Sequence, residues 1–228
     1  MRKTAAILIF LILTALAAYG QTAGDFNVTL NKAGDGVVIT GYTGKAAAVK
    51  IPAKIEGMPV KEIGDKAFLS NKIITSVVIP AGVTAIGKDA FVFCSKLTSV
   101  TLPDSLVIIG SGAFSLNGLT SINIPKNIKS VSEGLFSNCF QLKSVTIPEG
   151  VTDIELGAFA LCTSLAEIRL PSTLKVIGEK AFEGCSSLAS ITIPDSAETI
   201  NFGRFAFGGC QKLNLASQAL LKRRGYEI

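Results

Sequence analysis

Apolar residues recur with a period of about 23 residues along most of the chain. Phenylalanine marks the phase, because seven phenylalanines occupy one position of the repeat: Phe68, Phe91, Phe114, Phe136, Phe159, Phe182 and Phe207. Repeats of this length with recurring aliphatic positions are typical of solenoids, in which each repeat forms one coil covered by its neighbours. The pattern predicts one domain of about seven stacked coils over residues 52–213.

Each repeat contains three segments. The first has the pattern L-x-x-V-x-I, as in Leu142, Val145 and Ile147, and its last positions alternate as in a short parallel strand. Proline follows this segment in every repeat, where it ends the strand because it has no N–H for the ladder. These prolines are Pro52, Pro80, Pro103, Pro125, Pro148, Pro171 and Pro194. The second segment carries Ile or Val, usually before Gly, and the third carries Ala-Phe, so we expect both to point inward.

The spacing departs from the period in three places. Five extra residues fall within residues 54–62, one residue is missing around Gly118, and two extra residues lie between Asn201 and Phe205. Changes of this kind usually lie in loops on one face of a solenoid, and we interpret them as loop drift. For the segment 55–59 the alternative is a contact role.

Both ends differ from the repeats. Residues 26–30 and 37–40 flank Gly34-Asp35-Gly36, which predicts a hairpin, and residues 24–51 should form an amino-terminal cap with the first strand. Residues 215–223 have helical apolar spacing, with cations in the last turn and Gly225 placed to end the helix. We expect residues 214–228 to form a helical cap that closes the last coil.

The first 20 residues have the regions of a secretory signal peptide, with cleavage near residues 20–23. The apolar run over residues 4–18 is shorter than the roughly 20 residues that span a bilayer, and we expect no membrane span after its removal. No cysteine lies near the cleavage region and no hydrophobic tail ends the chain, so we expect no covalent anchor. The chain should be secreted or at the cell surface, with the periplasm as the alternative.

All five cysteines lie three residues after a repeat phenylalanine: Cys94, Cys139, Cys162, Cys185 and Cys210. Asn71 and Asn117 take this place in the other two repeats. Stacked side chains point the same way, which keeps their Cβ atoms too far apart for easy disulfide bonding, so we expect buried free thiols. Metal binding is not expected, because the cysteines are about 23 residues apart and the chain has no histidine.

Composition argues against an enzyme and against nucleic-acid binding. The absence of histidine removes the commonest general base, and no nucleophile elbow or phosphate-binding glycine loop occurs. A glycosidase-type carboxylate pair is the remaining alternative. The net charge of +5 falls to +3 without Arg2 and Lys3, and most other cations are dispersed. We expect no cofactor, and we assign the Lys222-Arg223-Arg224 cluster to a helix C-terminus.

The blocks L-x-x-V-x-I-P, I-G-x-x-A-F and C-x-x-L over residues 49–213 resemble the treponemal-type leucine-rich repeats of the BspA-like family of bacterial surface proteins. The resemblance implies an α/β leucine-rich-repeat solenoid, mostly β, coiled right-handedly with its parallel strands on one face. It also implies adhesion to host matrix proteins, to host cells or to other bacteria. The expected partner is therefore a protein or a glycan.

The residues between the buried aliphatics of the strand segment should point outward and align from coil to coil. Most carry hydroxyls, and stacked threonines also suit a purely structural role. Charge and amide groups gather in neighbouring coils at Asn123, Lys143, Glu167 and Arg169. The alternative for these is that Glu167 and Arg169 pair with each other or with Lys143 in water. The ligand-binding candidates are Thr101, Asn123, Lys143, Thr146, Glu167, Arg169 and Thr192.

Overall fold

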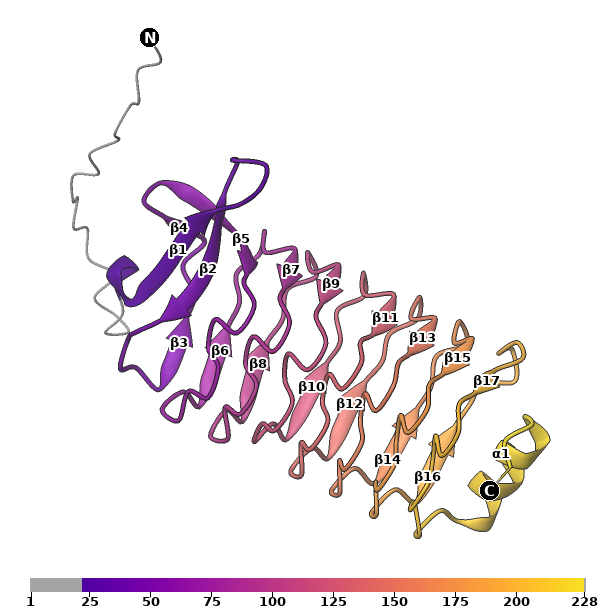
Figure 1. Cartoon of the computed structure of the whole chain (residues 1–228). Coiled ribbons are helices and arrows are strands. Elements are labelled where there is room, and N and C mark those ends of the chain that lie inside the picture. Colours follow the sequence, from indigo (N-terminus) through magenta and orange to yellow (C-terminus); the bar gives the residue numbers. More distant parts are fainter. Residues whose placement is uncertain (1–21, 228) are drawn as a thin grey trace.

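The computed structural model describes residues 22–227. The chain winds into an elongated solenoid of seven coils between an amino-terminal hairpin and a carboxyl-terminal helix (Figure 1). Each coil has three sides: two carry short strands, and the third is a run of turns. The repeat phenylalanines lie inside, and the predicted solenoid is confirmed.

The first side is the strand face, made by the L-x-x-V-x-I segments. Its strands are β3 (Ala48–Lys50), β6 (Ser76–Val78), β8 (Ser99–Thr101), β10 (Ser121–Asn123), β12 (Ser144–Thr146), β14 (Glu167–Arg169) and β16 (Ser190–Thr192). They pair in parallel as β3-β6-β8, β10-β12 and β14-β16. The central residue of each strand points inward and the flanking residues are mostly exposed, as the alternation predicts.

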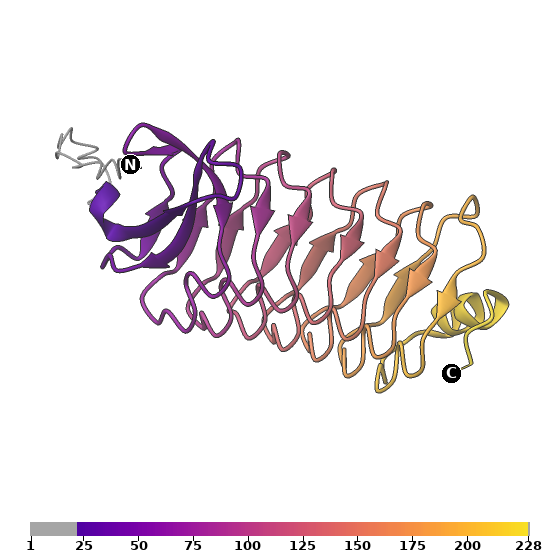
Figure 2. The same cartoon turned by 45° about the horizontal axis from the view of Figure 1, so that its top comes forward.

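The second side carries the Ile/Val-Gly segments. Its strands are β5 (Met58–Ile63), β7 (Ala85–Ile86), β9 (Ile108–Ile109), β11 (Ser130–Val131), β13 (Asp153–Ile154), β15 (Val176–Ile177) and β17 (Asn201–Phe202). The ladder β5-β7-β9 continues the amino-terminal cap, and β11-β13-β15-β17 forms a separate sheet. Figure 2 shows the two rows of strands running side by side along the molecule.

The third side is held by a backbone ladder that crosses every junction between coils. At the junction between Phe114 and Phe136, for example, the amides of Gly112, Phe114 and Leu116 donate to carbonyls of the next coil at 2.9–3.0 Å. The residues two before and two after each repeat phenylalanine have positive φ. Seven of these fourteen are Lys66, Ser70, Phe93, Leu116, Leu161, Lys180 and Phe205, which are not residue types that favour this conformation. The sequence therefore does not predict this ladder, because its positive-φ positions lack the residue types that usually mark them.

The phenylalanines form one stack along the core. Successive rings from Phe68 to Phe207 lie 4.6–5.9 Å apart and nearly parallel. Tyr42 stacks on the first ring at 5.4 Å, and Tyr226 meets the last ring edge-on at 5.4 Å. The aromatic column is therefore closed at both ends by tyrosine.

The predicted hairpin consists of β1 (Phe26–Leu30) and β2 (Val37–Tyr42), preceded by a 3-10 turn at Ala23–Asp25. β2 runs parallel to β5, so the hairpin covers the first coil. The five-residue insertion forms a second hairpin, β4 (Lys54–Ile55) against β5. Its turn residues Glu56 and Gly57 both have positive φ, as a tight two-residue hairpin requires.

The predicted carboxyl-terminal cap is helix α1 (Leu215–Arg223). Asn214 caps its start by accepting from the Ser217 amide at 2.8 Å, and Gly225 follows its end with φ +90°. Leu221 is fully buried, and the Ser217 hydroxyl accepts from the Ile191 amide at 3.0 Å. The helix thus fills positions that an eighth coil would otherwise occupy.

One junction differs from all others. Between the Phe114 coil and the Phe136 coil neither β8 pairs with β10 nor β9 with β11, so both strand ladders are interrupted there. The same junction has the shortened repeat and the widest ring spacing, 5.9 Å. A Cβ on Gly118 would lie 2.7 Å from the Ser95 carbonyl oxygen, so the shortened turn presses against the preceding coil. The missing residue therefore changes the coil stacking as well as a loop.

Candidate binding surface

All seven predicted binding residues are exposed on the strand face. Pairing places Asn123 beside Thr146 and Arg169 beside Thr192, and Thr101 holds the same place in β8. Glu167 begins β14 and lies beside Ser190, while Lys143 directly precedes β12. The structure therefore aligns Thr101, Asn123, Thr146, Arg169 and Thr192 in one row, with Lys143 and Glu167 next to it (Figure 1).

The charged candidates make no ion pair with one another. The ion pairs within residues 22–227 are Lys61–Asp35, Lys126–Asp104, Lys180–Glu179 and Arg223–Asp195. The structure therefore does not support mutual pairing of Lys143, Glu167 and Arg169. All three side chains remain exposed and available to a partner.

A second carboxylate lies near Arg169. Glu149 accepts hydrogen bonds from the hydroxyl and the amide of Ser172, and these bonds lower its pKa. The positive charge of Arg169 contributes in the same direction. No ion pair within residues 22–227 joins Arg169 to Glu149, so Arg169 is not neutralised by a close contact.

A break in the strand ladder divides the charged candidates. β12 pairs with β10 and β14 pairs with β16, but no ladder joins β12 to β14. The Ile147 amide has no acceptor in the described part of the chain, although the equivalent amides of Ile124 and Leu170 donate across their junctions at 3.0 and 2.9 Å. Val145, which points inward at this break, is only half-buried. We name this break the β12/β14 seam; Lys143 and Thr146 lie on one side, and Glu167 and Arg169 on the other.

The cysteines form the expected ladder of buried free thiols. Each Sγ donates to the carbonyl of the phenylalanine in the preceding coil at 3.1–3.2 Å. Desolvation raises their pKa values, to about 11 for Cys94 and about 12 for Cys139 and Cys210. Thiols in this state are poor nucleophiles and poor metal ligands. No cluster of three or more potential metal ligands occurs in residues 22–227.

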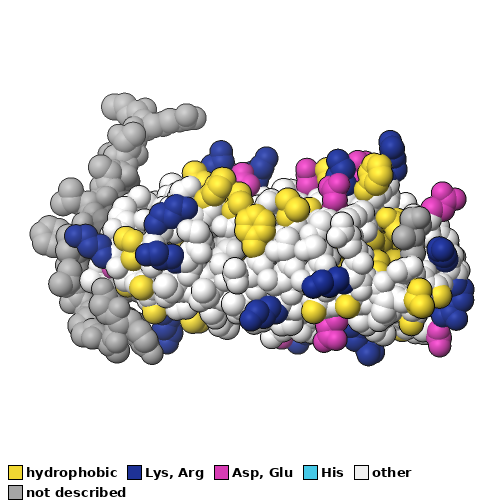
Figure 3. Space-filling view, turned by 90° about the horizontal axis from the view of Figure 1, so that it is seen from below, with side chains coloured by type: hydrophobic (Ala, Val, Ile, Leu, Met, Phe, Trp, Pro, Cys, Tyr) yellow, Lys and Arg dark blue, Asp and Glu magenta, His cyan; other side chains and the backbone are white. Residues whose placement is uncertain are grey.

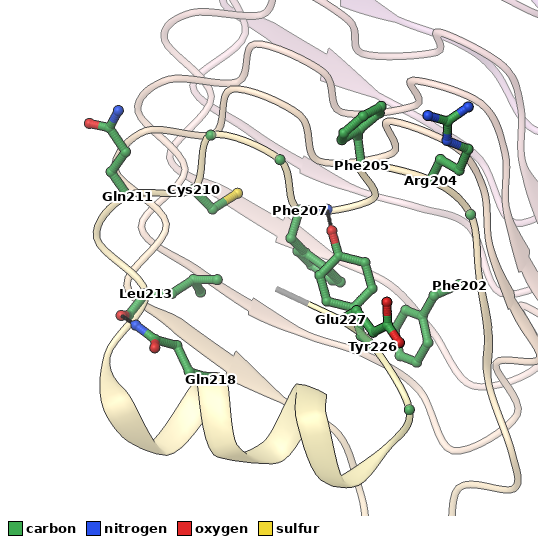
Figure 4. A pocket seen from close by; sticks show the side chains of 14 residues that line it. Phe202, Arg204, Phe205, Phe207, Cys210, Gln211, Leu213, Gln218, Tyr226 and Glu227 are labelled. Carbon is green, nitrogen blue, oxygen red and sulfur yellow. Dashed lines mark hydrogen bonds between the residues drawn. The ribbon is translucent and has the colours of Figure 1, made fainter.

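An open pocket of about 640 Å³ lies between the last coil and the cap. Phe202, Phe207 and Tyr226 form its aromatic wall, and the Tyr226 hydroxyl accepts from the Phe207 amide at 3.0 Å (Figure 4). None of the predicted binding residues lies there, and Glu227 is its only acid. The two-residue insertion near Phe205 was the sequence signal for this irregular end.

Comparison with known proteins gives the family. The family model described as BspA type leucine rich repeat region matches in six copies, over residues 61–188 and 153–219. The chain belongs to the BspA-type leucine-rich repeat family. No curated protein sequence matches it.

Solved structures agree with this family. A leucine-rich repeat protein of T. pallidum is 35% identical with a TM-score of 0.87, covering 91% of this chain and 96% of that protein. A leucine-rich cell surface protein of Faecalibacterium prausnitzii is 33% identical with a TM-score of 0.61, covering 78% of this chain and 55% of that one. A leucine-rich repeat protein of Eubacterium ventriosum is 27% identical with a TM-score of 0.66, covering 75% of this chain and 45% of that one. The chain thus spans about half of the latter two.

The remaining expectations concern export and membrane span. The predicted signal peptide and residues 20–21 of its cleavage region lie outside the described residues. Within residues 22–227, no helix has the length and apolar character needed to cross a bilayer.

Proposed function

We propose that this protein is an exported binding protein, acting as a bacterial adhesin that engages a protein or glycan through its strand face. The observation that carries the proposal is the set of exposed charges without ion-pair partners at the β12/β14 seam, Lys143, Glu167 and Arg169. Exposed charged groups without an internal ion-pair partner can form charge-assisted hydrogen bonds with a ligand, because no existing pair has to break first.

Two further observations support this proposal. The row of hydroxyls and the Asn123 amide extends the polar surface over five coils, which suits an extended partner. The F. prausnitzii relative is described as a cell surface protein, and its resemblance favours an exterior location for this chain. The absence of histidine and of a metal-binding cluster in the described residues gives no support to a catalytic role.

The test is solid-phase binding of residues 24–228 to immobilised fibronectin, fibrinogen, laminin and collagen. The test variant is Lys143→Ala/Glu167→Ala/Arg169→Ala. A matched control, Lys129→Ala/Lys175→Ala/Glu179→Ala, removes the same net charge from exposed positions beside the second-side strands. Thermal unfolding confirms that both variants are folded.

We expect saturable binding that the control retains and the test variant loses by at least tenfold, since several charged hydrogen bonds are removed together. Equal binding by both variants would place the site away from the strand face. No binding to any of the four proteins, with protection from added protease on intact cells, would favour a periplasmic interaction protein instead.

A further inference from the structure

The turns between the phenylalanine stack and the strand face form a second exposed surface. We name it the turn edge: residues 70–73, 93–96, 116–118, 138–141, 161–164, 184–187 and 209–212. It contains no aspartate or glutamate, although the chain has 17 acidic residues, and it carries Lys72, Lys96 and Lys212. Its charge is therefore purely positive.

Large apolar side chains protrude from this same edge. Ile73, Phe93, Phe140 and Leu161 are 43–48% exposed, although each follows the buried core phenylalanine of its coil by only a few residues. Figure 3 looks onto the molecule from the side of these turns and shows hydrophobic and cationic side chains between rims that hold most of the acidic ones. Single exposed hydrophobics are ordinary, but these four lie in two pairs of adjacent coils, at an edge that holds no acidic residue.

Backbone conformation makes two of these residues notable. Phe93 and Leu161 have φ of 60° and 59°, and the equivalent position of the last two coils is Gly184 and Gly209. Bulky residues pay about 1–2 kcal/mol for this left-handed conformation. Their amides belong to the ladder of the third side and donate to the Ser115 and Glu183 carbonyls at 3.1 and 2.7 Å. The ladder holds this conformation in every coil, while the side chains of Phe93 and Leu161 stay half-exposed.

Local contacts hold Phe93 in place. The Lys72 ammonium donates to the Phe93 carbonyl at 2.6 Å and lies 5.7 Å from the centre of its ring. Coils repeat about every 4.8 Å, so Phe93 and Leu161, three coils apart, are roughly 14 Å from each other along the solenoid. The apolar side chains thus protrude at separate points along the edge, and Lys72 is held beside one of them.

From this arrangement we propose that the turn edge binds the surface of an anionic lipid bilayer. Apolar tips can enter the acyl boundary while lysines meet lipid phosphates, and both contributions add at one edge. A bilayer bound at the turn edge would lie beside the strand face without covering it. The lipid proposal therefore does not depend on the adhesin proposal.

The test is co-sedimentation of residues 24–228 with phosphatidylcholine vesicles, with and without phosphatidylglycerol. The test variant is Phe93→Gly/Leu161→Gly, which installs the residue already present at positions 184 and 209 and so keeps the fold. The control Val107→Thr/Ile108→Thr removes two apolar side chains, 51% and 60% exposed, at β9 and the residue before it. A third variant, Lys96→Gln/Lys212→Gln, removes charge alone.

We expect binding to the phosphatidylglycerol vesicles that weakens with salt and falls about tenfold or more in the test variant but not in the control. Each lysine should account for about fivefold. The proposal is overturned if wild-type protein fails to bind these vesicles, or if the test variant binds as well as the control. Retention on immobilised heparin without vesicle binding would also overturn it and identify a polyanionic glycan as the partner.

Discussion

At the scale of single residues, the position three after each repeat phenylalanine holds Cys or Asn, and either side chain can donate a hydrogen bond to the same carbonyl of the preceding coil. The acceptor is the carbonyl of the phenylalanine in the preceding coil, and Cys139 Sγ donates to that of Phe114 at 3.1 Å. Asn117 donates through Nδ2 to that of Phe91 at 3.0 Å. The amide carries an additional oxygen, and Asn117 Oδ1 is buried without a partner among the described residues.

We therefore predict that Asn117→Cys stabilises the protein. The change keeps a donor to the Phe91 carbonyl and removes the unsatisfied oxygen, whose desolvation costs about 1–3 kcal/mol. Because a thiol is a weaker donor than an amide, we expect a net gain of about 1 kcal/mol in urea unfolding. The reverse change, Cys139→Asn, should destabilise, and a stabilised Cys139→Asn would refute this reasoning.

The thiols also predict a dependence of stability on pH. Burial raises the pKa of Cys139 from 9.0 to about 12, so between these values the unfolded chain releases a proton that the folded chain keeps. The free energy of unfolding should therefore fall as the pH rises from 9 to 12, by about 1.4 kcal/mol per pH unit for each such thiol. Below pH 9 the effect is absent. Urea unfolding of wild type and Cys139→Ala isolates it: lysine titration is common to both, the lost packing lowers the stability of the variant at every pH, and the difference in slope between pH 9 and 12 reports the thiol.

At the scale of elements, regular periodicity made the strands, hairpin and helix predictable. Alternation in the segment Lys143–Ile147 correctly placed Lys143 and Thr146 outside. The seam was not predictable, since it depends on the offset between coils and not on any residue type in β12 or β14. The turn-side ladder was missed because its left-handed positions hold residues such as Phe93 and Leu161 in place of glycine.

The two breaks in the strand-face ladder predict a pattern of amide exchange that follows the hydrogen bonds between coils. Ile79, Ile124 and Leu170 donate to the next coil at 2.9–3.1 Å, whereas Leu102 and Ile147 occupy the same position without an acceptor in the described chain. We expect the amides of Leu102 and Ile147 to exchange at least tenfold faster than the other three under native conditions, because no hydrogen bond must open first. Residue-resolved hydrogen exchange measures this, and the three bonded amides are the internal control. Equal protection at all five positions would show that the ladder closes in solution.

At the scale of the whole molecule, each coil depends on its neighbours, so the weakest junction sets where cooperativity fails. That junction lies between the Phe114 and Phe136 coils, where both strand ladders stop. Across it run the turn-side ladder, a long backbone bond of 3.4 Å from the Thr120 amide to the Thr98 carbonyl, a few side-chain bonds such as Ser132 Oγ to the Ile109 carbonyl, and one ring contact at 5.9 Å. The Phe159 coil, by contrast, is joined to the coil after it by the β13-β15 ladder and a ring contact at 5.2 Å.

This contrast predicts that two similar truncations act differently. Phe114→Ala and Phe159→Ala each remove a fully buried ring and should each cost about 3–5 kcal/mol. Phe114→Ala also removes one side of the only ring contact across the interrupted junction, so residues 22–118 and 119–227 should unfold in separate steps. Phe159→Ala leaves the β13-β15 ladder paired at the following junction, and its unfolding should stay as cooperative as that of the wild type. Hydrogen exchange with mass spectrometry along a urea series separates the two segments, and simultaneous opening of both in Phe114→Ala would show that the remaining hydrogen bonds across the junction couple the halves.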